Sequence, residues 1–379
     1  MTLSPFYTPE HEAFRDSVRR FVAREIEPYA DGWDEAGEFP RALYARAAAV
    51  GLLGLGFPEE YGGVATDRFH AIIATQELTR CGAGGVCASL MSHTIGAPPI
   101  AKLGSDRMKA RVLPAILSGE KISALAITEP SGGSDVANLR TSARRDGDDY
   151  VVRGEKTFIT SGMRADYYTV AVRTGGPGMG GISLLLIERD RPGFTRTPLK
   201  KMGWWASDTA TLHFDDCRVP AENLIGTENA GFIGIMMNFN DERLGLAASS
   251  IGFARVCLDE AVAYAGQRET FGKPLTRHQV IRHKLVDMAQ KIHASQAMLE
   301  LLAWRIDRGE NPIAELCMLK NQATQTLAFC ATEAVQIFGG AGFMRGAKVE
   351  RIYREVKVNA IGGGAEEIMK DLASRQMGL

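Results

Sequence analysis

A glutamate interrupts an otherwise apolar helical stripe in the segment FNDERLG. At helical spacing, Glu242 shares its face with Ile235, Phe239 and Leu246. Glutamate is rarely buried unless it has a partner or a chemical task. Burial raises the pKa of a carboxyl group toward neutrality, where the carboxylate is an effective general base. Glu242 is therefore a candidate catalytic base. The alternative is an exposed glutamate that pairs with Arg243 or with a lysine on the helix surface.

Two glycine-rich segments could bring backbone N–H groups close to a ligand. IGGGAEEI (361–368) places three consecutive glycines before two glutamates, and ITEPSGGSD (127–135) follows a β-rich run. Glycine permits positive φ angles and close approach of the backbone, and exposed N–H groups and hydroxyls bind polar or phosphorylated groups. No strand precedes the first segment, and it lacks the lysine and hydroxyl of a P-loop, which sets that interpretation aside. For the second segment, a plain turn after a strand remains an equal alternative.

The composition is that of an ordinary globular enzyme. The chain has 379 residues, of which 45% are hydrophobic and 23% charged, and its formal net charge is −1. This charge gives no reason to expect binding to nucleic acid or to an anionic membrane. The six cysteines form no C-x-x-C pair, and the chain contains neither a secretory signal pattern nor an apolar run of 18 residues. We expect a soluble cytoplasmic protein with reduced thiols and no metal.

The period of the apolar residues divides the chain into three blocks. The first block is helical: Thr8 is expected to cap a helix that starts at Pro9, and a later helical run stops at Gly51. From about Ser123, short β-rich runs are separated by Gly, Pro and Asp, which predicts a compact β domain. After about residue 233, three long helical runs joined by short loops predict an antiparallel bundle. The expected domains are residues 1–122 (α-helical), 123–232 (β) and 233–379 (helical bundle).

Several of these segments resemble one known family. TEPSGGSD (128–135) resembles the signature of the acyl-CoA dehydrogenases, flavoenzymes that oxidise acyl-CoA thioesters to 2-enoyl-CoA. Over essentially the whole chain, further segments are similar to that family in the same order: GFPEEYGG (56–63), GEKTFITSG (154–162), QRETFGKPLTRHQ (267–279) and VQIFGGAGF (335–343). The resemblance implies a mainly α fold with a central β domain: an N-terminal helical domain, a middle β-barrel-like domain and a C-terminal four-helix bundle.

The resemblance also implies an FAD site shared between subunits. Phe158 stands where many relatives carry a tryptophan beside the flavin ring, which keeps an apolar wall but loses the indole donor. The implied FAD contacts within one subunit are Leu125, Ile127, Thr128, Gly133, Ser134, Phe158, Ile159, Thr160, Ala365 and Glu367. Those implied from a neighbouring subunit are Arg268, Thr270, Phe271, Leu275, His278, Gln279, Gln336, Ile337, Gly339 and Gly340. Outside the family context, Arg268 is better interpreted as a solvated surface charge.

The position of the catalytic base departs from the commonest family pattern. In many relatives a glutamate in the C-terminal segment removes the α-proton of the thioester, and its counterpart here is Gly363. Isovaleryl-CoA and long-chain acyl-CoA dehydrogenases carry the base on the first bundle helix instead, at the position of Glu242. The resemblance therefore assigns the base to Glu242 and leaves Gly363 a backbone N–H for the thioester carbonyl. The implied substrate contacts are Ser134, Phe239, Arg243, Gly363 and Gly364.

The resemblance implies a homotetrameric FAD-dependent acyl-CoA dehydrogenase of fatty acid or branched-chain amino acid catabolism. Its electrons would pass to an electron-transfer flavoprotein. One alternative is an acyl-CoA oxidase that reduces O₂, although oxidases usually carry further C-terminal domains. Nitroalkane oxidases and flavin-dependent monooxygenases share the fold, and a non-catalytic relative is suggested by the glycine at 363. Turnover with O₂ as sole acceptor separates the oxidase from the dehydrogenase.

Overall fold

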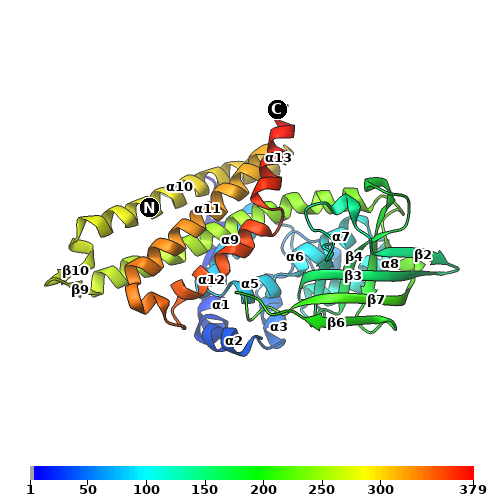
Figure 1. Cartoon of the computed structure of the whole chain (residues 1–379), viewed down its shortest axis with the longest axis horizontal. Helices are drawn as coiled ribbons and strands as arrows, with labels where there is room; N and C mark the ends of the chain where they lie inside the picture. The colour runs from blue at the N-terminus through cyan, green and yellow to red at the C-terminus, as the bar shows by residue number, and fades with distance from the viewer. Residues whose placement is uncertain (1–3) are drawn as a thin grey trace.

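Helical segments lie on both sides of a β-rich segment in the chain, as the apolar periods predicted (Figure 1). The computed structural model describes residues 4–379. The sheet occupies one end of the elongated molecule, and three long helices extend to the other end. The expectation of a mainly α fold with a central β domain is confirmed. None of the helices within the described residues is long and apolar enough to cross a membrane.

From residue 4 onward, the N-terminal block contains eight α-helices. Their bounds are α1 Pro9–Glu25, α2 Ala30–Ala36, α3 Ala42–Ala49, α4 Arg68–Leu78, α5 Gly84–Leu90, α6 His93–Gly96, α7 Pro98–Leu103 and α8 Asp106–Leu117. The predicted start of α1 is confirmed, because the Thr8 hydroxyl accepts a hydrogen bond from the His11 N–H and Pro9 takes the first helical position. Gly51, just beyond α3, has a φ of +80°, which glycine adopts without strain.

The caps of α1 and α4 interlock through two histidines. Thr8 N–H donates to His11 Nδ1 at 3.0 Å, so the Nε2 of a neutral His11 carries the proton and donates to Asp67 at 3.0 Å. Asp67 is the N-cap of α4, where its carboxylate accepts from the His70 N–H at 3.1 Å and from His70 Nδ1 at 2.7 Å. The hydrogen bonds among His11, Asp67 and His70 thus join the N-terminal caps of the two helices.

The middle block forms one mixed eight-stranded sheet. Its strands are β1 Ser123–Ala126, β2 Ser142–Asp146, β3 Asp149–Thr160, β4 Tyr167–Arg173, β5 Ile182–Glu188, β6 Phe194–Pro198, β7 Thr209–Pro220 and β8 Leu224–Ile225. Their order is β6-β7-β3-β2-β4-β5-β8, with β1 parallel to β4. The β3–β7 pairing is irregular between Lys156 and Ile159, at a β-bulge that exposes Phe158.

The C-terminal block is built on three long helices. These are α9 Gly231–Gln267, α10 Gln279–Asp307 and α11 Ile313–Phe338, and the short hairpin β9 Glu269–Thr270 and β10 Lys273–Pro274 joins the first two. Two shorter helices follow, α12 Lys348–Ile361 and α13 Glu366–Gln376, with the glycine segment 362–364 between them. Most of the buried apolar residues of α9, α10, α11 and α12 belong to one core cluster, which explains why their apolar periods are so regular.

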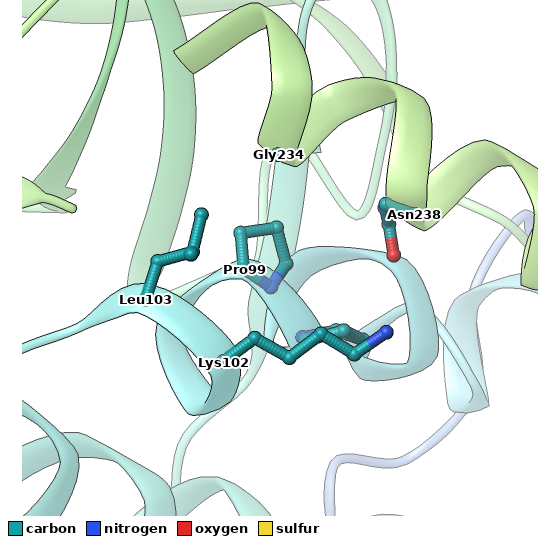
Figure 2. A pocket seen from close by; sticks show the side chains of 6 residues that line it. Pro99, Lys102, Leu103, Gly234 and Asn238 are labelled. Carbon is teal, nitrogen blue, oxygen red and sulfur yellow. The ribbon is translucent and has the colours of Figure 1, made fainter. Parts of the chain in front are cut away.

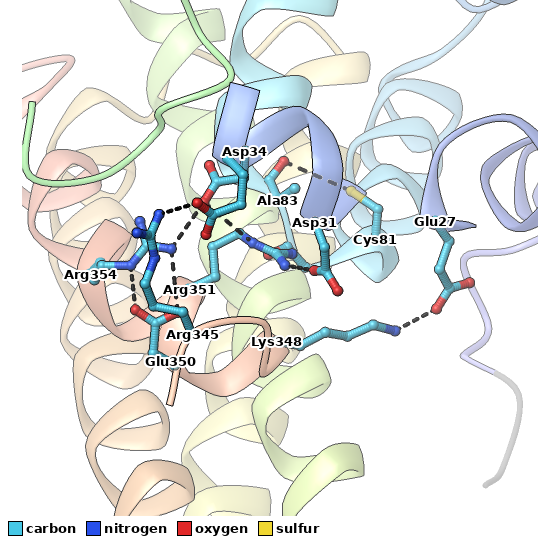
Figure 3. Close-up of polar contacts among 12 residues, drawn as sticks. Glu27, Asp31, Asp34, Cys81, Ala83, Arg345, Lys348, Glu350, Arg351 and Arg354 are labelled. Carbon is cyan, nitrogen blue, oxygen red and sulfur yellow. Dashed lines mark hydrogen bonds and ion pairs between the residues drawn. The ribbon is translucent and has the colours of Figure 1, made fainter. Parts of the chain in front are cut away.

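Ion pairs anchor α12 to the N-terminal helices (Figure 3). Arg351, which is 2% exposed, donates to the Gly82 carbonyl at 3.1 Å, and Arg354 Nη2 donates to Asp34 at 2.9 Å. Glu355 accepts the backbone N–H groups of Gly84 at 2.8 Å and Trp204 at 3.1 Å. Burial raises the pKa of Glu355 to about 7. Because α12 runs directly into Gly362, these contacts fix where the glycine segment begins.

The ion pairs between α12 and α2 predict that two neighbouring acidic residues contribute unequally to the stability of the protein. Asp34→Ala is expected to destabilise the protein by about 1–3 kcal/mol, since it removes the buried carboxylate that Arg351 and Arg354 share, while Asp31 and Glu350 still pair with them. The matched control is Glu35→Ala, which removes the exposed ion pair with Arg345 and should cost about 0–1 kcal/mol. Thermal unfolding of both variants measures the difference. Equal unfolding temperatures would contradict the proposed anchoring.

Candidate active site

The Glu242 side chain is half-buried, and one of its two carboxyl oxygens is shielded from solvent. Its Oε2 atom is shielded from solvent and has no hydrogen-bond partner among the described residues. Burial raises the pKa of Glu242 from 4.5 to about 7, although the charges of Arg243 and Lys320 act in the opposite direction. A desolvated carboxyl group with a pKa near 7 has the properties of a general base poised at physiological pH.

Gly363 faces this carboxyl group across the gap between α9 and the segment after α12. A Cβ atom on Gly363 would lie 3.7 Å from Cδ of Glu242 and would overlap Cδ1 of Leu246. The φ angle of Gly363 is +64°, which side-chain-bearing residues rarely adopt. No acceptor within residues 4–379 takes the Gly363 backbone N–H. With this backbone and the present position of Leu246, the site favours glycine, and its N–H lies on the segment that faces the Glu242 carboxyl group.

Helix α11 clamps the glycine segment from the other side. Lys320 is fully buried, and its ammonium donates to the carbonyls of Ala360 at 2.9 Å and Gly364 at 2.7 Å. The amide of Asn321 donates to the Glu366 carbonyl at 3.0 Å. Sequence reasoning missed both residues. The signal was available, because Lys320 shares a helical stripe with Leu316, Ala323 and Leu327, just as Glu242 shares one with apolar residues.

The two other bundle residues predicted to contact substrate lie next to Glu242 in the chain. Arg243 is 5% exposed, and its Nη1 donates to Asn240 at 2.9 Å while its Nε has no partner among the described residues. Its guanidinium lies 5.9 Å from the ring centroid of Phe239. Arg243 is thus held by Asn240 and the Phe239 ring through part of its guanidinium group, and no salt bridge between Arg243 and Glu242 is present in residues 4–379.

The TEPSGGSD loop is held from beneath by a buried ion pair. Lys156 Nζ donates to Glu129 at 2.8 Å and to the Ile127 carbonyl at 3.0 Å. The same Glu129 carboxylate accepts the backbone N–H groups of Arg140 at 2.6 Å and Thr141 at 2.8 Å. These hydrogen bonds give partners to the buried polar groups on the inner side of the loop. Its outer residues, including Gly133 and Ser134, are exposed to solvent, whereas the exposed Ser131 donates its hydroxyl to Glu129 at 3.4 Å.

Phe158 is held in a strained and exposed position beside this loop. It has a φ of +60° and a side chain that is 69% exposed, whereas the next residue, Ile159, is buried. A positive φ costs about 1–3 kcal/mol for such a residue and is found where a functional site requires it. The neighbouring Thr157 N–H donates to the Thr128 carbonyl at 2.9 Å, which joins the bulge to the loop. Thr160 pairs with Thr209 on β7.

Apolar packing connects the loop to the bundle helix that carries Glu242. Phe239, one turn before Glu242, belongs to the same apolar cluster as Ile127 and Leu125, which lead into Thr128. The residues around Glu242 and those around Phe158 are therefore parts of one region at the junction of sheet and bundle. Ala365 and Glu367 begin α13 just beyond Gly363. Ala365 is the N-cap of that helix and has no hydroxyl to cap it.

The remaining residues predicted to contact the cofactor lie elsewhere. The β9–β10 hairpin is at the end of the bundle that points away from the sheet (Figure 1). At its tip, Phe271 has a φ of +51° and is 98% exposed. The segment with Gln336, Ile337, Gly339 and Gly340 lies near the same end, because Phe338 stacks on Tyr264 at 4.2 Å, one turn before Arg268. A single chain does not bring these residues to Thr128 and Phe158.

A hollow between α7 and α9 is a packing irregularity rather than part of this site (Figure 2). Its volume of about 10 Å³ suits a single water, and it is lined by Pro98, Pro99, Lys102, Leu103, Gly234 and Asn238. Lys102 pairs with Asp241 at 3.3 Å, and the Asn238 amide donates to the Ile95 carbonyl at 2.9 Å. Asn238 and Asp241 thus secure α9 to its neighbours while Glu242 faces Gly363.

The groups at the junction suit a flat, polar ligand and a thioester. The exposed Phe158 ring offers a surface for an aromatic ring system, and the Ser134 hydroxyl with the N–H groups of Gly133 and Ser134 offers partners for polar atoms. The donor set therefore fits a flavin beside the loop. The Gly363 N–H, which has no acceptor within residues 4–379, and the Glu242 carboxyl group lie on facing segments, as an oxyanion donor and a base acting on one substrate would.

Three family models match almost the whole chain. They are described as the acyl-CoA dehydrogenase N-terminal domain (residues 8–120), middle domain (124–217) and C-terminal domain (229–378). An acyl-CoA dehydrogenase of Bacillus subtilis is 38% identical over 374 residues, which cover 98% of this chain and 98% of the relative.

Solved structures agree with the family models. A crystal structure of a probable acyl-CoA dehydrogenase from Mycobacterium abscessus has a TM-score of 0.97 at 49% identity, covering 98% of this chain and 100% of the other. A glutaryl-CoA dehydrogenase from Mycobacterium smegmatis, solved in complex with FADH2, has a TM-score of 0.93 at 27% identity, covering 99% of this chain and 96% of the other.

Proposed function

We propose, because this chain belongs to the acyl-CoA dehydrogenase family, that it oxidises an acyl-CoA to 2-enoyl-CoA with Glu242 as the base that removes the α-proton. Members of this family are FAD-dependent oxidoreductases. The observation that carries the proposal is the closeness of a carboxyl group whose Oε2 is solvent-shielded and unpartnered to a glycine whose N–H has no acceptor within residues 4–379. The two groups are complementary in a single reaction, since one removes a proton and the other stabilises the charge that develops.

In this account Gly363 holds the thioester and Glu242 acts on its α-carbon. The Gly363 N–H donates to the carbonyl oxygen, which makes the neighbouring C–H more acidic because the resulting negative charge is delocalised onto that oxygen. The Glu242 carboxylate accepts the proton and becomes neutral in a site that favours its neutral form. When bound, FAD supplies the acceptor for the hydride that leaves the β-carbon. The substrate thus loses two hydrogens: one as this hydride, and the other as the α-proton that Glu242 accepts.

The residues proposed to hold FAD come from two copies of the chain. Leu125, Ile127, Thr128, Gly133, Ser134, Phe158, Ile159, Thr160, Ala365 and Glu367 are assigned to one copy. The residues of the distant hairpin and of the Gly339–Gly340 segment are assigned to a neighbouring copy, since one chain keeps them away from the loop. The exposed Phe271 side chain supports this assignment, because an aromatic ring that is 98% exposed is a typical contact for a partner.

The assembly, the electron acceptor and the cellular location stay predictions. We propose a homotetramer, an electron-transfer flavoprotein as acceptor, and a cytoplasmic protein. Ser134, Phe239, Arg243 and Gly364 are proposed to contact the acyl-CoA. The buried guanidinium of Arg243 supports this role, because a desolvated positive charge with an unpartnered Nε atom is suited to a CoA oxygen.

An anaerobic screen tests the proposed function. The purified holoprotein is mixed with short, medium, long, branched and aromatic acyl-CoA thioesters, and the flavin absorbance is followed. Bleaching by one class, with 2-enoyl-CoA formed in equal amount, is the expected result. A flavin that stays oxidised with every thioester would contradict the proposal. Rapid turnover with O₂ as the only acceptor would assign the chain to the oxidases instead.

A further inference from the structure

Lys320 is the buried charge that the proposed reaction does not yet use. It lies on α11, its side chain is fully buried, and its ammonium bonds to the carbonyls of Ala360 and Gly364. Ala360 belongs to the last turn of α12, where carbonyl groups lack helical partners. Gly364 follows Gly363 directly. The ammonium therefore bridges the two sides of the turn that presents the Gly363 N–H.

A lysine is costly to bury, so its retention in this stripe requires compensation. Burial lowers the pKa of Lys320 from 10.5 to about 8, and Glu366 and Glu242 act to raise it. Two carbonyl acceptors and the negative end of α12 compensate for part of the lost hydration. A methionine or leucine would fill the same volume without this cost. The presence of a lysine at position 320 is therefore better explained by a role of its charge than by side-chain packing.

The charge of Lys320 acts on Glu242. The groups that face the Glu242 carboxyl are Arg243 on α9 and Lys320 on α11, and both favour its ionised form. Cys317 on α11 and Glu366 on α13 are the other titratable groups near Lys320. Arg243 is already engaged by Asn240, whereas Lys320 lies next to the turn that carries Gly363.

We propose that Lys320 is a positioning residue for the reaction proposed above: its ammonium holds the 360–364 turn so that the Gly363 N–H faces the substrate, and its charge keeps Glu242 ionised. The proposal rests on the assignment of Glu242 as base. It adds a residue that contacts neither substrate nor cofactor and acts through the backbone and through the electric field. The two effects can be separated, because one depends on hydrogen bonds and the other on charge.

Two neutral variants separate the clamp from the charge. Lys320→Met removes both the charge and the donors, whereas Lys320→Gln removes the charge and keeps an amide that can donate to a carbonyl. The matched control is Lys357→Met, on the exposed face of α12. All variants are examined as holoprotein, with thermal unfolding as a check on folding. The readouts are the pH dependence of anaerobic flavin reduction by acyl-CoA and the pH titration of the Glu242 carboxylic-acid infrared band. That band is identified by its loss in Glu242→Gln.

The neutral variants should move the titration of Glu242 to higher pH. The wild-type carboxyl group is about half ionised near pH 7, and activity rises with pH because only the ionised form is a base. A shift of about one pH unit lowers the ionised fraction at pH 7 to about one tenth, so flavin reduction slows about fivefold. At high pH, Lys320→Gln should recover more of the wild-type rate than Lys320→Met. Lys357→Met should match wild type in both readouts.

A wild-type titration midpoint in either folded Lys320 variant would overturn the role of the charge. Equal rates of flavin reduction at high pH for Lys320→Met, Lys320→Gln and wild type would overturn the proposal that the ammonium holds the 360–364 turn. A purely structural lysine would lower the unfolding temperature without moving the midpoint. The infrared titration needs no turnover, so it judges the effect of Lys320 on Glu242 even if no acyl-CoA bleaches the flavin. In that case the proposed function fails while the electrostatic pairing is still tested.

Discussion

Glu242→Gln is expected to slow flavin reduction by acyl-CoA by about 10²–10⁴-fold while FAD stays bound. Glutamine keeps the size of the side chain and cannot accept the α-proton, so the loss measures the base alone. Glu242 makes no salt bridge within the described residues, and its Oε2 has no donor there. Removal of its charge should therefore leave the fold intact and raise the unfolding temperature slightly, because a desolvated carboxyl group is neutralised.

The matched control for this variant is Asp241→Asn on the same helix. Asp241 pairs at the surface with Arg68 at 3.1 Å and Lys102 at 3.3 Å, so its neutralisation removes a carboxylate that faces away from Gly363. Single-turnover flavin reduction under anaerobic conditions compares the two variants with wild type. The asparagine variant should retain a near-native rate. A near-native rate in the Glu242→Gln variant would reject the assignment of the base.

Gly363→Ala is expected to lower both stability and the rate of flavin reduction. The added methyl overlaps Leu246 Cδ1 and lies 3.6 Å from the Glu242 Oε1 atom, and alanine also adopts the φ of +64° at a cost. Overpacking and the left-handed backbone together should cost about 2–5 kcal/mol. If the turn shifts to relieve the overlap, the N–H leaves its position, and loss of one oxyanion donor lowers the rate by about 10²–10³-fold.

Gly309→Ala separates backbone strain from overlap. Gly309 has a φ of +89° between α10 and α11, and an added Cβ there would meet no atom within 4 Å. This control should show the cost of the φ angle alone, about 1–2 kcal/mol, with a wild-type rate of flavin reduction. Unfolding temperatures and single-turnover rates of the two alanine variants give the comparison. Equal stability and equal rates in the two would show that Gly363 is not constrained by Leu246.

The sequence predicted those elements whose apolar period is long and uninterrupted. The helix that contains Glu242 runs from Gly231 to Gln267, and its apolar residues repeat over its whole length. The strand β7 (TATLHFDDCRVP) lies within the β-rich block expected from about Ser123, and its residues alternate between the two faces of the sheet. By contrast, β2 (SARRD) went unrecognised, since it buries one residue and is otherwise polar. Its place in the sheet is set by pairing with β3, which no local pattern reports.

The candidate site could be predicted where a single residue contradicts its surroundings. Glu242 was identifiable because a carboxylate in an apolar stripe is unusual. Gly363 was identifiable because this sequence has a glycine where many relatives carry a glutamate. Lys320 satisfies the same criterion, but its role depends on carbonyl groups 40 and 44 residues further along the chain, which its own helix does not reveal. The contact between Gly363 and Leu246, and the positive φ of Phe158, depend on how distant segments pack and have no local signal in the sequence.

Exchange of the α-hydrogen tests the assignment of the base most directly, because it isolates proton removal from hydride transfer. The wild-type holoprotein and the Glu242→Gln variant are incubated in D₂O with an acyl-CoA that has α-hydrogens and no β-hydrogen, and deuterium in the acyl group is measured by mass spectrometry. The account predicts deuterium at the α-carbon with wild type, at a rate that rises with pH through about 7, and none above the buffer background with the variant. Exchange at the wild-type rate in Glu242→Gln would contradict it.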